Sequence, residues 1–332
     1  MPQTQIYTNS SEVPLALAVF LASDYYDHNP DPFTISATTL LKPIRQIVLP
    51  RRVDNSVGLI NLADQMSNRL GAAIHDGIQR AWETNHVRAL EALGYPKRVI
   101  DRVRINPTKA KLAADPDIIP VYMEQRLSKR VGKWLVTGKF DFIAEGQVED
   151  FKTASVWSYK NQVNADKQIM QGSIYRWLDP ELINKPTMRI HHIFMDWRAS
   201  QVQSDPTYPK QRFHTQSFPL LDVTETDRII RTKLSDIDRF MDADEDQLPH
   251  CTDEDLWVSD PVFKYYKSGD TTKRSTKNFD DRAKAMIFMS NEGKGQGVIK
   301  EVAGEARACK YCAAFPVCTQ KDLLIEQGRL VV

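Results

Sequence analysis

The sequence lacks any apolar run long enough to cross a lipid bilayer. A membrane-spanning helix needs about 20 consecutive apolar residues, and the longest early run, from Val13 to Ala22, is far shorter. No Lys or Arg precedes that run, so it also lacks the charged start of a secretory signal peptide. The sequence therefore predicts a chain that works inside the cell and has no membrane partner.

An excess of charge of either sign is also missing. Lys and Arg number 44 against 43 Asp and Glu, which leaves a net charge of +1 over 332 residues. Bulk charge therefore identifies no partner. Two local groups of basic residues are candidate nucleic-acid surfaces, although most charge runs are simply solvated. They are Lys42, Arg45, Arg51 and Arg52, and then Lys97, Arg98, Arg102, Arg104, Lys109 and Lys111.

Cysteine is scarce, and all four copies lie in the last third of the chain. Cys309, Cys312 and Cys318 fall close together, and Cys251 is the only other one. Disulfides are rare in the cytosol, so such clustering favours a metal site. Zinc and iron–sulfur centres both take four ligands. The four cysteines are therefore predicted to share one zinc or iron–sulfur centre, with four separate reduced thiols as the alternative.

The apolar residues are enough for a sizeable core, since they make up 42% of the chain. Their spacing at three- and four-residue steps predicts a long helix from Asn61 to Leu93. Strands and helices then alternate, which predicts an α/β or α+β core with appendages. The predicted strands are Val121–Leu127, Lys133–Ile143, Gln147–Thr153, Met188–Trp197 and Arg212–Phe218, and the predicted helices are Lys160–Leu178 and one that Thr224 caps.

Asp150 and Lys152 are two residues apart on a predicted strand, so their side chains point to one face of it. Asp141 lies on the preceding strand of the same hairpin, and a tight turn brings its carboxylate near Asp150. Two neighbouring carboxylates form an oxygen site that suits Mg²⁺ or Mn²⁺. Lys152 adds a positive charge that can orient an attacking water or offset charge in a phosphoryl transition state. Taken alone, Asp-x-Lys is common, and an exposed hairpin with a salt bridge is the ordinary alternative.

The surrounding motifs set this pair in a wider pattern. Asp141 lies in GKFDF and Asp150 in EDFKT, while QGSIY carries Gln171 and Tyr175 four residues apart on the next predicted helix. Upstream, GAAIH ends on His75. Together and in this order, the motifs resemble the RecB-like branch of the PD-(D/E)XK nuclease superfamily. That branch includes CRISPR-associated iron–sulfur exonucleases and phage-encoded exonucleases.

The resemblance implies a role for each matched residue. The catalytic residues would be Asp141, Asp150 and Lys152. The metal ligands would be His75, Asp141, Asp150 and the backbone carbonyl of Phe151, and the residues that contact substrate would be Gln171 and Tyr175. For His75 the alternative is an ordinary core histidine, and for Gln171 and Tyr175 it is helix packing.

Two further acidic residues are weighed against the same pattern. Glu124 falls where related chains often carry an acidic residue on the first strand, which suggests a supporting role near the site. Glu149 adjoins Asp150 but points to the opposite face of the strand. We therefore exclude Glu149 from the predicted site.

The resemblance also implies a domain plan and a function. Residues 111–245 would form the PD-(D/E)XK core, a mixed central sheet flanked by helices. Residues 1–110 would be a helical part of the nuclease domain, and residues 246–332 a cysteine-rich segment. The activity would be that of a deoxyribonuclease, an exonuclease in DNA recombination, repair or phage DNA processing, in the cytoplasm of a bacterium or a phage-infected host cell.

Partners and competing functions follow from the same resemblance. Single- or double-stranded DNA would be the substrate, and a recombinase, helicase or single-strand-binding protein a further partner. The alternatives are a structure- or sequence-specific endonuclease and a catalytically silent nucleic-acid-binding subunit. The complete set of Asp141, Asp150 and Lys152 argues against the silent subunit.

The cysteine pattern matches only in part that of the iron–sulfur nucleases which the motifs resemble. Their last three cysteines are spaced similarly, but their first lies ahead of the nuclease motifs. The comparable stretch of this chain reads LLKPIRQ and has no cysteine. The resemblance favours an iron–sulfur centre, whereas this departure leaves zinc as the alternative, and Cys251 is predicted to supply the fourth ligand.

Overall fold

The structure, a computed structural model, describes residues 6–23, 29–53 and 59–331. The chain forms two compact units: unit 1 comprises residues 1–41 and 55–234, and unit 2 comprises residues 42–54 and 235–332. The boundaries expected after residues 110 and 245 remain predictions. Within the described residues, no helix has both the length and the apolar character that crossing a membrane requires.

Unit 1 is built on a six-stranded mixed sheet, in the order β11-β10-β9-β8-β5-β4. The strands are β4 (Val103–Ile105), β5 (Ile119–Met123), β8 (Phe142–Ala144), β9 (Gln147–Ala154), β10 (Thr187–Phe194) and β11 (Phe213–Pro219). β9 and β10 run parallel, as do β4 and β5, and the other neighbours are antiparallel. The predicted alternation of helices and strands in a mixed α/β fold is thus confirmed.

A second sheet of unit 1 has the order β2-β7-β6, with β2 (Thr34–Ser36), β6 (Arg126–Val131) and β7 (Trp134–Lys139). The chain passes from one sheet to the other between β5 and β6, and back between β7 and β8. The predictions of single strands over Val121–Leu127 and Lys133–Ile143 are therefore wrong. At the first crossing Glu124 adopts a left-handed backbone conformation, with φ of 53°, which no continuous strand contains.

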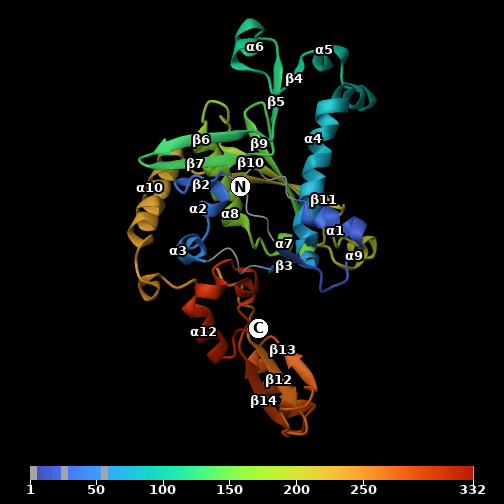
Figure 1. Ribbon diagram of the computed structural model, residues 1–332. Coiled ribbons are helices and arrows are strands. Elements are labelled where there is room, and N and C mark those ends of the chain that lie inside the picture. The colour runs from blue at the N-terminus through green and yellow to red at the C-terminus, as the bar shows by residue number, and fades with distance from the viewer. Residues whose placement is uncertain (1–5, 24–28, 54–58, 332) are drawn as a thin grey trace. The chain divides into compact units, whose positions relative to one another are not determined.

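The helices of unit 1 follow the predicted pattern with two differences. α4 (Met66–Ala92), a single long helix in Figure 1, is preceded by the 3₁₀ turn η2 (Leu62–Gln65) and followed by Gly94, with φ of 80°. The helix predicted over Lys160–Leu178 is α8 (Ala165–Leu178), which ends at the predicted residue but begins five residues later, after the separate short helix α7 (Val156–Lys160). The cap of α10 (Val223–Phe240) is Asp222, whose Oδ1 accepts from the Thr224 N–H at 2.7 Å, and not Thr224 itself.

The apolar faces of these elements close the core of unit 1. Side chains of β10 alternate between buried and more exposed positions, and Met188, Ile190 and Phe194 are fully buried. Trp177 of α8 is also fully buried, and its ring nitrogen donates to Asp227 of α10 at 2.9 Å. Alternation of this kind buries one face of a strand and fixes its register.

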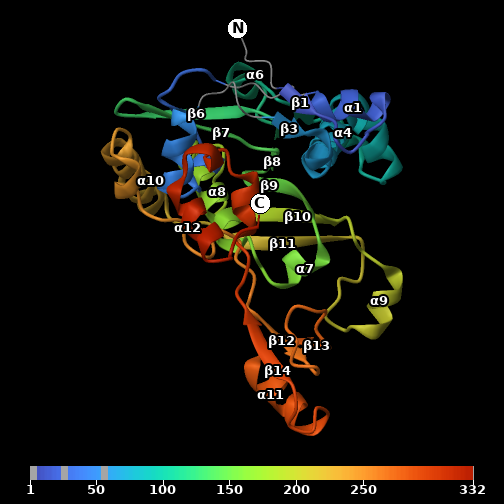
Figure 2. The ribbon, with the colours of Figure 1, turned by 60° about the horizontal axis from the view of Figure 1, so that its bottom comes forward.

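Unit 2 contains an antiparallel sheet in the order β13-β12-β14, with β12 (Val262–Tyr266), β13 (Lys277–Phe279) and β14 (Val298–Val302). Figure 2 shows α11 (Arg282–Asn291) beside this sheet. Phe288 of α11 contacts the rings of Tyr265 and Phe279, at 5.5 and 5.2 Å between centroids. A second apolar cluster of unit 2 contains Cys251, Leu256, Ala306, Cys309, Leu324 and Leu330.

The remaining elements are short. In unit 1 they are β1 (Ile6–Thr8), α1 (Leu15–Ala22), α2 (Ala37–Leu40), β3 (Leu59–Asn61), α5 (Lys97–Ile100), α6 (Lys109–Ala114) and α9 (Ala199–Ser204). In unit 2 they are α3 (Ile44–Val48), η1 (Leu49–Arg52), η3 (Glu245–Gln247), η4 (Arg307–Tyr311), η5 (Phe315–Val317) and α12 (Thr319–Glu326).

Candidate functional site

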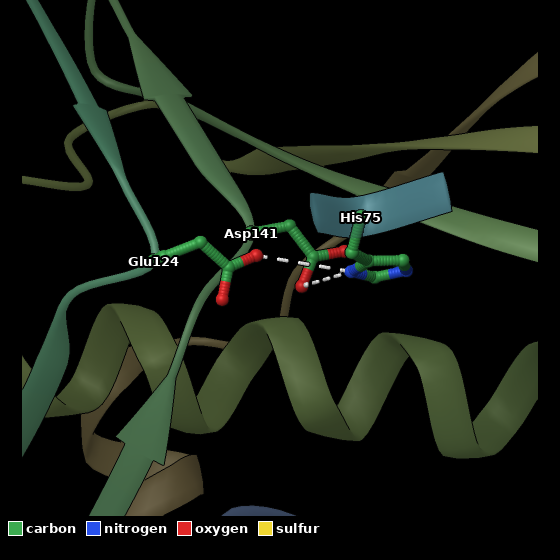
Figure 3. A group of neighbouring side chains, drawn as sticks. All are labelled: His75, Glu124 and Asp141. Carbon is green, nitrogen blue, oxygen red and sulfur yellow. Dashed lines mark ion pairs between the residues drawn. The ribbon is translucent and has the colours of Figure 1, made fainter. Parts of the chain in front are cut away.

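One group of side chains in unit 1 has the geometry of a metal site. His75, Glu124 and Asp141 each offer one ligand atom, and these atoms lie within 4.8 Å of one another. Figure 3 shows both carboxylates turned toward the same edge of the imidazole ring. The Nδ1 of His75 is 3.5 Å from Oδ1 of Asp141 and 3.8 Å from Oε1 of Glu124. Ligands on opposite sides of an octahedral Mg²⁺ lie about 4.2 Å apart, twice its bond length, so this spacing suits such an ion.

The crossings between the two sheets bring the carboxylates together. Glu124 directly follows β5 and Asp141 directly precedes β8, and the Glu124 N–H donates to the Asp141 carbonyl at 3.2 Å. At the same place the Phe140 N–H donates to the Gln125 carbonyl at 3.3 Å. Each acidic residue thus lies where the chain passes between the two sheets, outside the regular strands. His75 comes to the same point from the middle of α4.

The second ring nitrogen of His75 is held by the backbone of β9. His75 Nε2 lies 2.9 Å from the Phe151 carbonyl oxygen, and the Phe151 N–H donates to Asp141 Oδ2 at 2.8 Å. With Nε2 donating to this carbonyl, Nδ1 faces the two carboxylates. Metal-binding histidines commonly donate their other N–H to a carbonyl or carboxylate in this manner. The Phe151 carbonyl oxygen accepts from His75 in this structure. Its role as a metal ligand stays a prediction.

The charges around His75 shift its pKa strongly. Hydrogen bonds to Asp141 and then to Glu124 raise the pKa of His75 to about 10, and burial opposes this only in part. Burial acts to raise the pKa of Asp141, but His75 and Lys152 outweigh it and the pKa is lowered. Lys139 places its Nζ 2.5 Å from Glu124 Oε2. The two carboxylates therefore favour a positive charge at Nδ1 of His75, which in the metal-free chain is a proton.

Asp150 and Lys152 of β9 lie next to this group but not within it. Lys152 Nζ is 2.6 Å from Asp150 Oδ2, and neither carboxylate oxygen has another polar partner among the described residues. Asp150 is 1% exposed, whereas the Lys152 side chain keeps 35% of its surface. Burial raises the pKa of Asp150 to about 6 against the opposing charge of Lys152, and Asp141 raises it further. Such a buried, under-partnered carboxylate is costly for folding, which is typical of a functional group.

Gln171 and Tyr175 share a buried face of α8, as their spacing predicts. Gln171 Nε2 donates to the Tyr175 hydroxyl at 2.7 Å, and that hydroxyl donates to the Lys139 carbonyl at 2.8 Å. Gly138 makes room for the ring, since a Cβ there would come 2.8 Å from Tyr175 Cδ1. The pair therefore supports the end of β7, two residues before Asp141.

Glu149 and Asp150 are neighbours on β9, and their side chains have different partners because they point to opposite faces of the strand. Glu149 accepts from His191 at 2.8 Å and from Arg189 at 3.1 Å, away from Asp150. For Glu124 the sequence predicts a place within a continuous strand and only a supporting role near the site. The structure brings Glu124 to His75 and Asp141, and leaves Asp150 beside them with Lys152.

The four cysteines of unit 2 line one small cavity. Cys251, Cys309, Cys312 and Cys318 surround a space of about 20 Å³, which Arg45 and Gln46 of α3 also line. Burial raises the pKa of Cys251 to about 12 and that of Cys309 to about 11, and the other thiols add to both shifts. Gln320 of α12 holds Cys251 in place, because its amide bonds both the N–H and the carbonyl of that residue at 2.9 Å.

Arg45 belongs to this cavity rather than to a basic surface. Its side chain is 1% exposed and forms an ion pair with Glu245. It also donates to the Leu248 carbonyl at 2.9 Å and lies 3.7 Å from Cys318 Sγ. The interpretation of Arg45 as part of a nucleic-acid surface is therefore wrong, because the residue is enclosed by acceptors.

Comparisons with known proteins give likenesses of structure alone. No family model and no curated protein matches the chain. The chain is similar to the crystal structure of SSO0001, with 15% identity and a TM-score of 0.38, over 68% of this chain and 87% of that one. It is also similar to a phage-related exonuclease from Haemophilus somnus 129PT (11% identity, TM-score 0.29, 63% and 93% covered). A third is an alkaline exonuclease from Laribacter hongkongensis (8% identity, TM-score 0.30, 64% and 94% covered). TM-scores this low do not by themselves define a shared fold.

Proposed function

We propose that the chain is a divalent-cation-dependent deoxyribonuclease with a PD-(D/E)XK core, which hydrolyses phosphodiester bonds of DNA. One observation carries the proposal: His75 Nδ1 faces the carboxylates of Glu124 and Asp141 at 3.8 and 3.5 Å. The Asp150–Lys152 pair adjoins this group through β9. An oxygen-rich cation site with a lysine beside it suits this reaction, because the cation can polarise the phosphate and the lysine can offset its developing charge.

The donor set fits Mg²⁺ or Mn²⁺. Carboxylate oxygens are the ligands that these ions prefer, and the group supplies two of them beside one imidazole nitrogen. The raised pKa of His75 shows that Asp141 and Glu124 stabilise a positive charge at this position, which a divalent cation would supply in place of the proton. His75, Glu124 and Asp141 would hold the ion, with Asp150 as a further oxygen ligand. The ion would supply polarisation of the scissile phosphate and a lowered pKa of the attacking water.

The chain's own residues would do the remaining work. Lys152 would hold the attacking water in line and offset the charge that develops on the phosphate oxygens. Asp150 would keep the ammonium group of Lys152 in place through their 2.6 Å ion pair. The Gln171–Tyr175 pair would fix the backbone that positions Asp141, through the Tyr175 bond to the Lys139 carbonyl.

We further propose that the four cysteines hold an iron–sulfur centre. The support for a cluster is the spacing of Cys309, Cys312 and Cys318, which is similar to that of the iron–sulfur nucleases that the motifs resemble. Zinc is the alternative, because the cavity among the four cysteines, about 20 Å³, has room for a single ion.

The finer role rests on the resemblance of the motifs. We assign the chain as an exonuclease of recombination, repair or phage DNA processing, in the cytoplasm, with a recombinase, helicase or single-strand-binding protein as candidate partners. End-labelled linear and closed circular DNA, single- and double-stranded, should be incubated with Mg²⁺, Mn²⁺ or chelator. We expect digestion of linear DNA from an end, only with a cation.

Other outcomes of this assay separate the alternatives. Rapid nicking of closed circles would identify an endonuclease. Binding without cleavage under every condition would identify a silent subunit. If the chain neither binds nor cleaves DNA under any of these conditions, the nuclease proposal is overturned.

A further inference from the structure

A cleft of about 360 Å³ opens in unit 1 beside the predicted catalytic lysine. It lies among β9, β10, β11 and the helices α7 and α8, and Lys152 and Gln171 are part of its wall. Its volume falls in the range of sites for small organic ligands, roughly 300–1,000 Å³. Neither the cation site nor the Gln171–Tyr175 pair explains the rest of this wall.

The chemistry of the wall favours a nucleotide. Among the described residues that line the cleft there is no carboxylate, and there are two lysines, Lys152 and Lys167. Most of the others carry a hydroxyl or an amide, including Ser158 and Gln168. Tyr159 adds an aromatic ring. Positive charge for a phosphate, an aromatic ring and neutral hydrogen-bonding groups together are the features of single-strand sites.

His192 stands out within this wall. It is 5% exposed, and neither of its ring nitrogens has a hydrogen-bond partner within the described part of the chain. The side chain of Gln216 lies near enough to the ring to oppose the lowering of its pKa, but its amide nitrogen donates to Gln162 at 2.8 Å and not to the ring. Buried polar groups are nearly always satisfied. Two unsatisfied nitrogens in the wall of a cleft therefore indicate a ligand that completes them.

The state of the ring points to a base rather than a phosphate. Burial, followed by the charge of His214, lowers the pKa of His192 to about 4, with Gln216 opposing the shift. The neutral ring has one donor and one acceptor nitrogen. Nucleobase edges present donors and acceptors side by side, whereas a phosphate offers acceptors alone.

We propose that this cleft binds one unpaired nucleotide of the DNA strand being cut, and that His192 bonds the edge of its base. The cleft would thus hold the nucleotide next to the scissile phosphate, with Lys152 between the two. A base must leave its pair before a buried group can contact its pairing edge, so the site selects single-stranded ends. This inference rests on the proposed nuclease function and specifies its substrate.

The test compares DNA binding by full-length variants that cannot cut. In an Asp141→Asn background with chelator, His192 is changed to Phe or to Gln, and His86→Phe on α4 is the matched control. A fluorescein-labelled single-stranded oligonucleotide and a blunt duplex are titrated by fluorescence anisotropy, and thermal midpoints are recorded. His192→Phe should weaken single-strand binding about 10-fold or more, the scale of one good base contact, and affect the duplex much less.

The companion readouts distinguish a binding role from a structural one. His192→Phe should keep or raise the thermal midpoint, because the ring nitrogens it removes have no partner to lose. His192→Gln retains a donor and an acceptor and should bind within about 3-fold of the parent. Should His192→Phe fail to fold, Lys167→Ala in the half-buried wall carries the test, with the same selective loss of single-strand binding.

The failures of the two proposals differ. If the wild type cuts DNA and His192→Phe binds single strands like its parent, the cleft is not a nucleotide site. The same holds if His86→Phe weakens binding equally. If the wild type cuts no DNA and the Asp141→Asn parent binds none, the nuclease proposal is overturned, and this proposal with it.

Discussion

The two candidate centres of this chain differ in the charge they hold before any metal binds. In unit 1, Glu124 and Asp141 are carboxylates whose negative charge raises the pKa of His75 to about 10. In unit 2, burial raises the pKa of Cys251 to about 12, so the thiols remain neutral until a metal displaces their protons. The first centre suits a hard cation that exchanges with solvent, and the second a soft centre that stays bound. Brief exposure to chelator should therefore remove only the first.

The largest effect should come from Lys152. Lys152→Ala removes the only cation paired with Asp150 in the described structure, and cleavage should fall at least ~10²-fold, the scale for losing one well-placed electrostatic group. The variant should still fold, with Asp150 taking up a proton in place of its lost partner. DNA binding should fall far less than cleavage, because Lys167 still lines the cleft. Lys185→Ala, an exposed lysine of the same unit, is the control. Cleavage by Lys152→Ala within a few-fold of wild type would remove the catalytic assignment.

The cysteine centre should respond in stability and not in chemistry. Cys251→Ser should lower the iron content of the purified chain and lower the thermal midpoint of unit 2, because a structural metal contributes directly to folding. Mn²⁺ binding in unit 1 should not change. Thr252→Ser, the neighbouring position, is the matched control. Aerobically purified protein should be brown with an iron–sulfur centre and colourless with zinc. Unchanged metal content and midpoint in Cys251→Ser would show that Cys251 is no ligand.

The pH dependence of Mn²⁺ binding should separate the two centres more finely. His75 holds its proton up to a pKa of about 10 in the free chain, so a cation bound at Nδ1 must displace that proton. Apparent affinity should rise up to about 10-fold per pH unit between roughly pH 7 and 9 and level off above the pKa. Calorimetry in two buffers of different ionisation enthalpy would count the proton released. A flat affinity over that range would exclude Nδ1 as a ligand.

The smallest effect concerns two neighbouring carboxylates of β9. Burial raises the pKa of Asp150 to about 6, above the value of 3.8 that is usual for aspartate, so its ionisation lowers stability as pH rises through that window. With chelator at pH 8, Asp150→Asn should raise the unfolding free energy by on the order of 1 kcal/mol, and it should have no effect near pH 4.

Glu149→Gln is the matched control for Asp150→Asn. Burial alone would raise the pKa of Glu149, but His191 and Arg189 outweigh it and the pKa is lowered. Stability from Glu149 is therefore present above its unfolded pKa and lost as pH falls through the folded one. Chemical denaturation should show Glu149→Gln to be destabilising at pH 8. Two substitutions with the same sign would contradict the assignment of opposite faces.

The sequence predicted the motif residues better than the backbone that carries them. Asp150 and Lys152 share a face because strand alternation is local and needs no long-range information. The break between β5 and β6 at Glu124 could not be predicted, because no Gly or Pro lies there and the flanking residues are common in strands. Its left-handed conformation depends on hydrogen bonds to the strand around Asp141, which only the assembled sheets provide.

Two other residues were beyond local patterns for the same reason. Arg45 reads as part of a basic cluster, but its partner Glu245 lies 200 positions away along the chain. His192 reads as an ordinary strand residue of β10, and its unsatisfied nitrogens depend on what α7, α8 and β11 place around it. Burial and partnership at such positions are properties of the tertiary structure and leave no periodic signal in the sequence.

The central claim is that DNA cleavage depends on a cation held by His75, Glu124 and Asp141. Mn²⁺ binding to the metal-free chain, followed by electron paramagnetic resonance, tests it most directly when paired with cleavage of linear DNA. We predict that His75→Ala, Glu124→Gln and Asp141→Asn each weaken Mn²⁺ binding about 10-fold or more and reduce cleavage in parallel. The claim would be contradicted if the wild type cleaved DNA at full rate in excess chelator. It would also be contradicted if the variants lost Mn²⁺ binding but cleaved DNA as fast as the wild type.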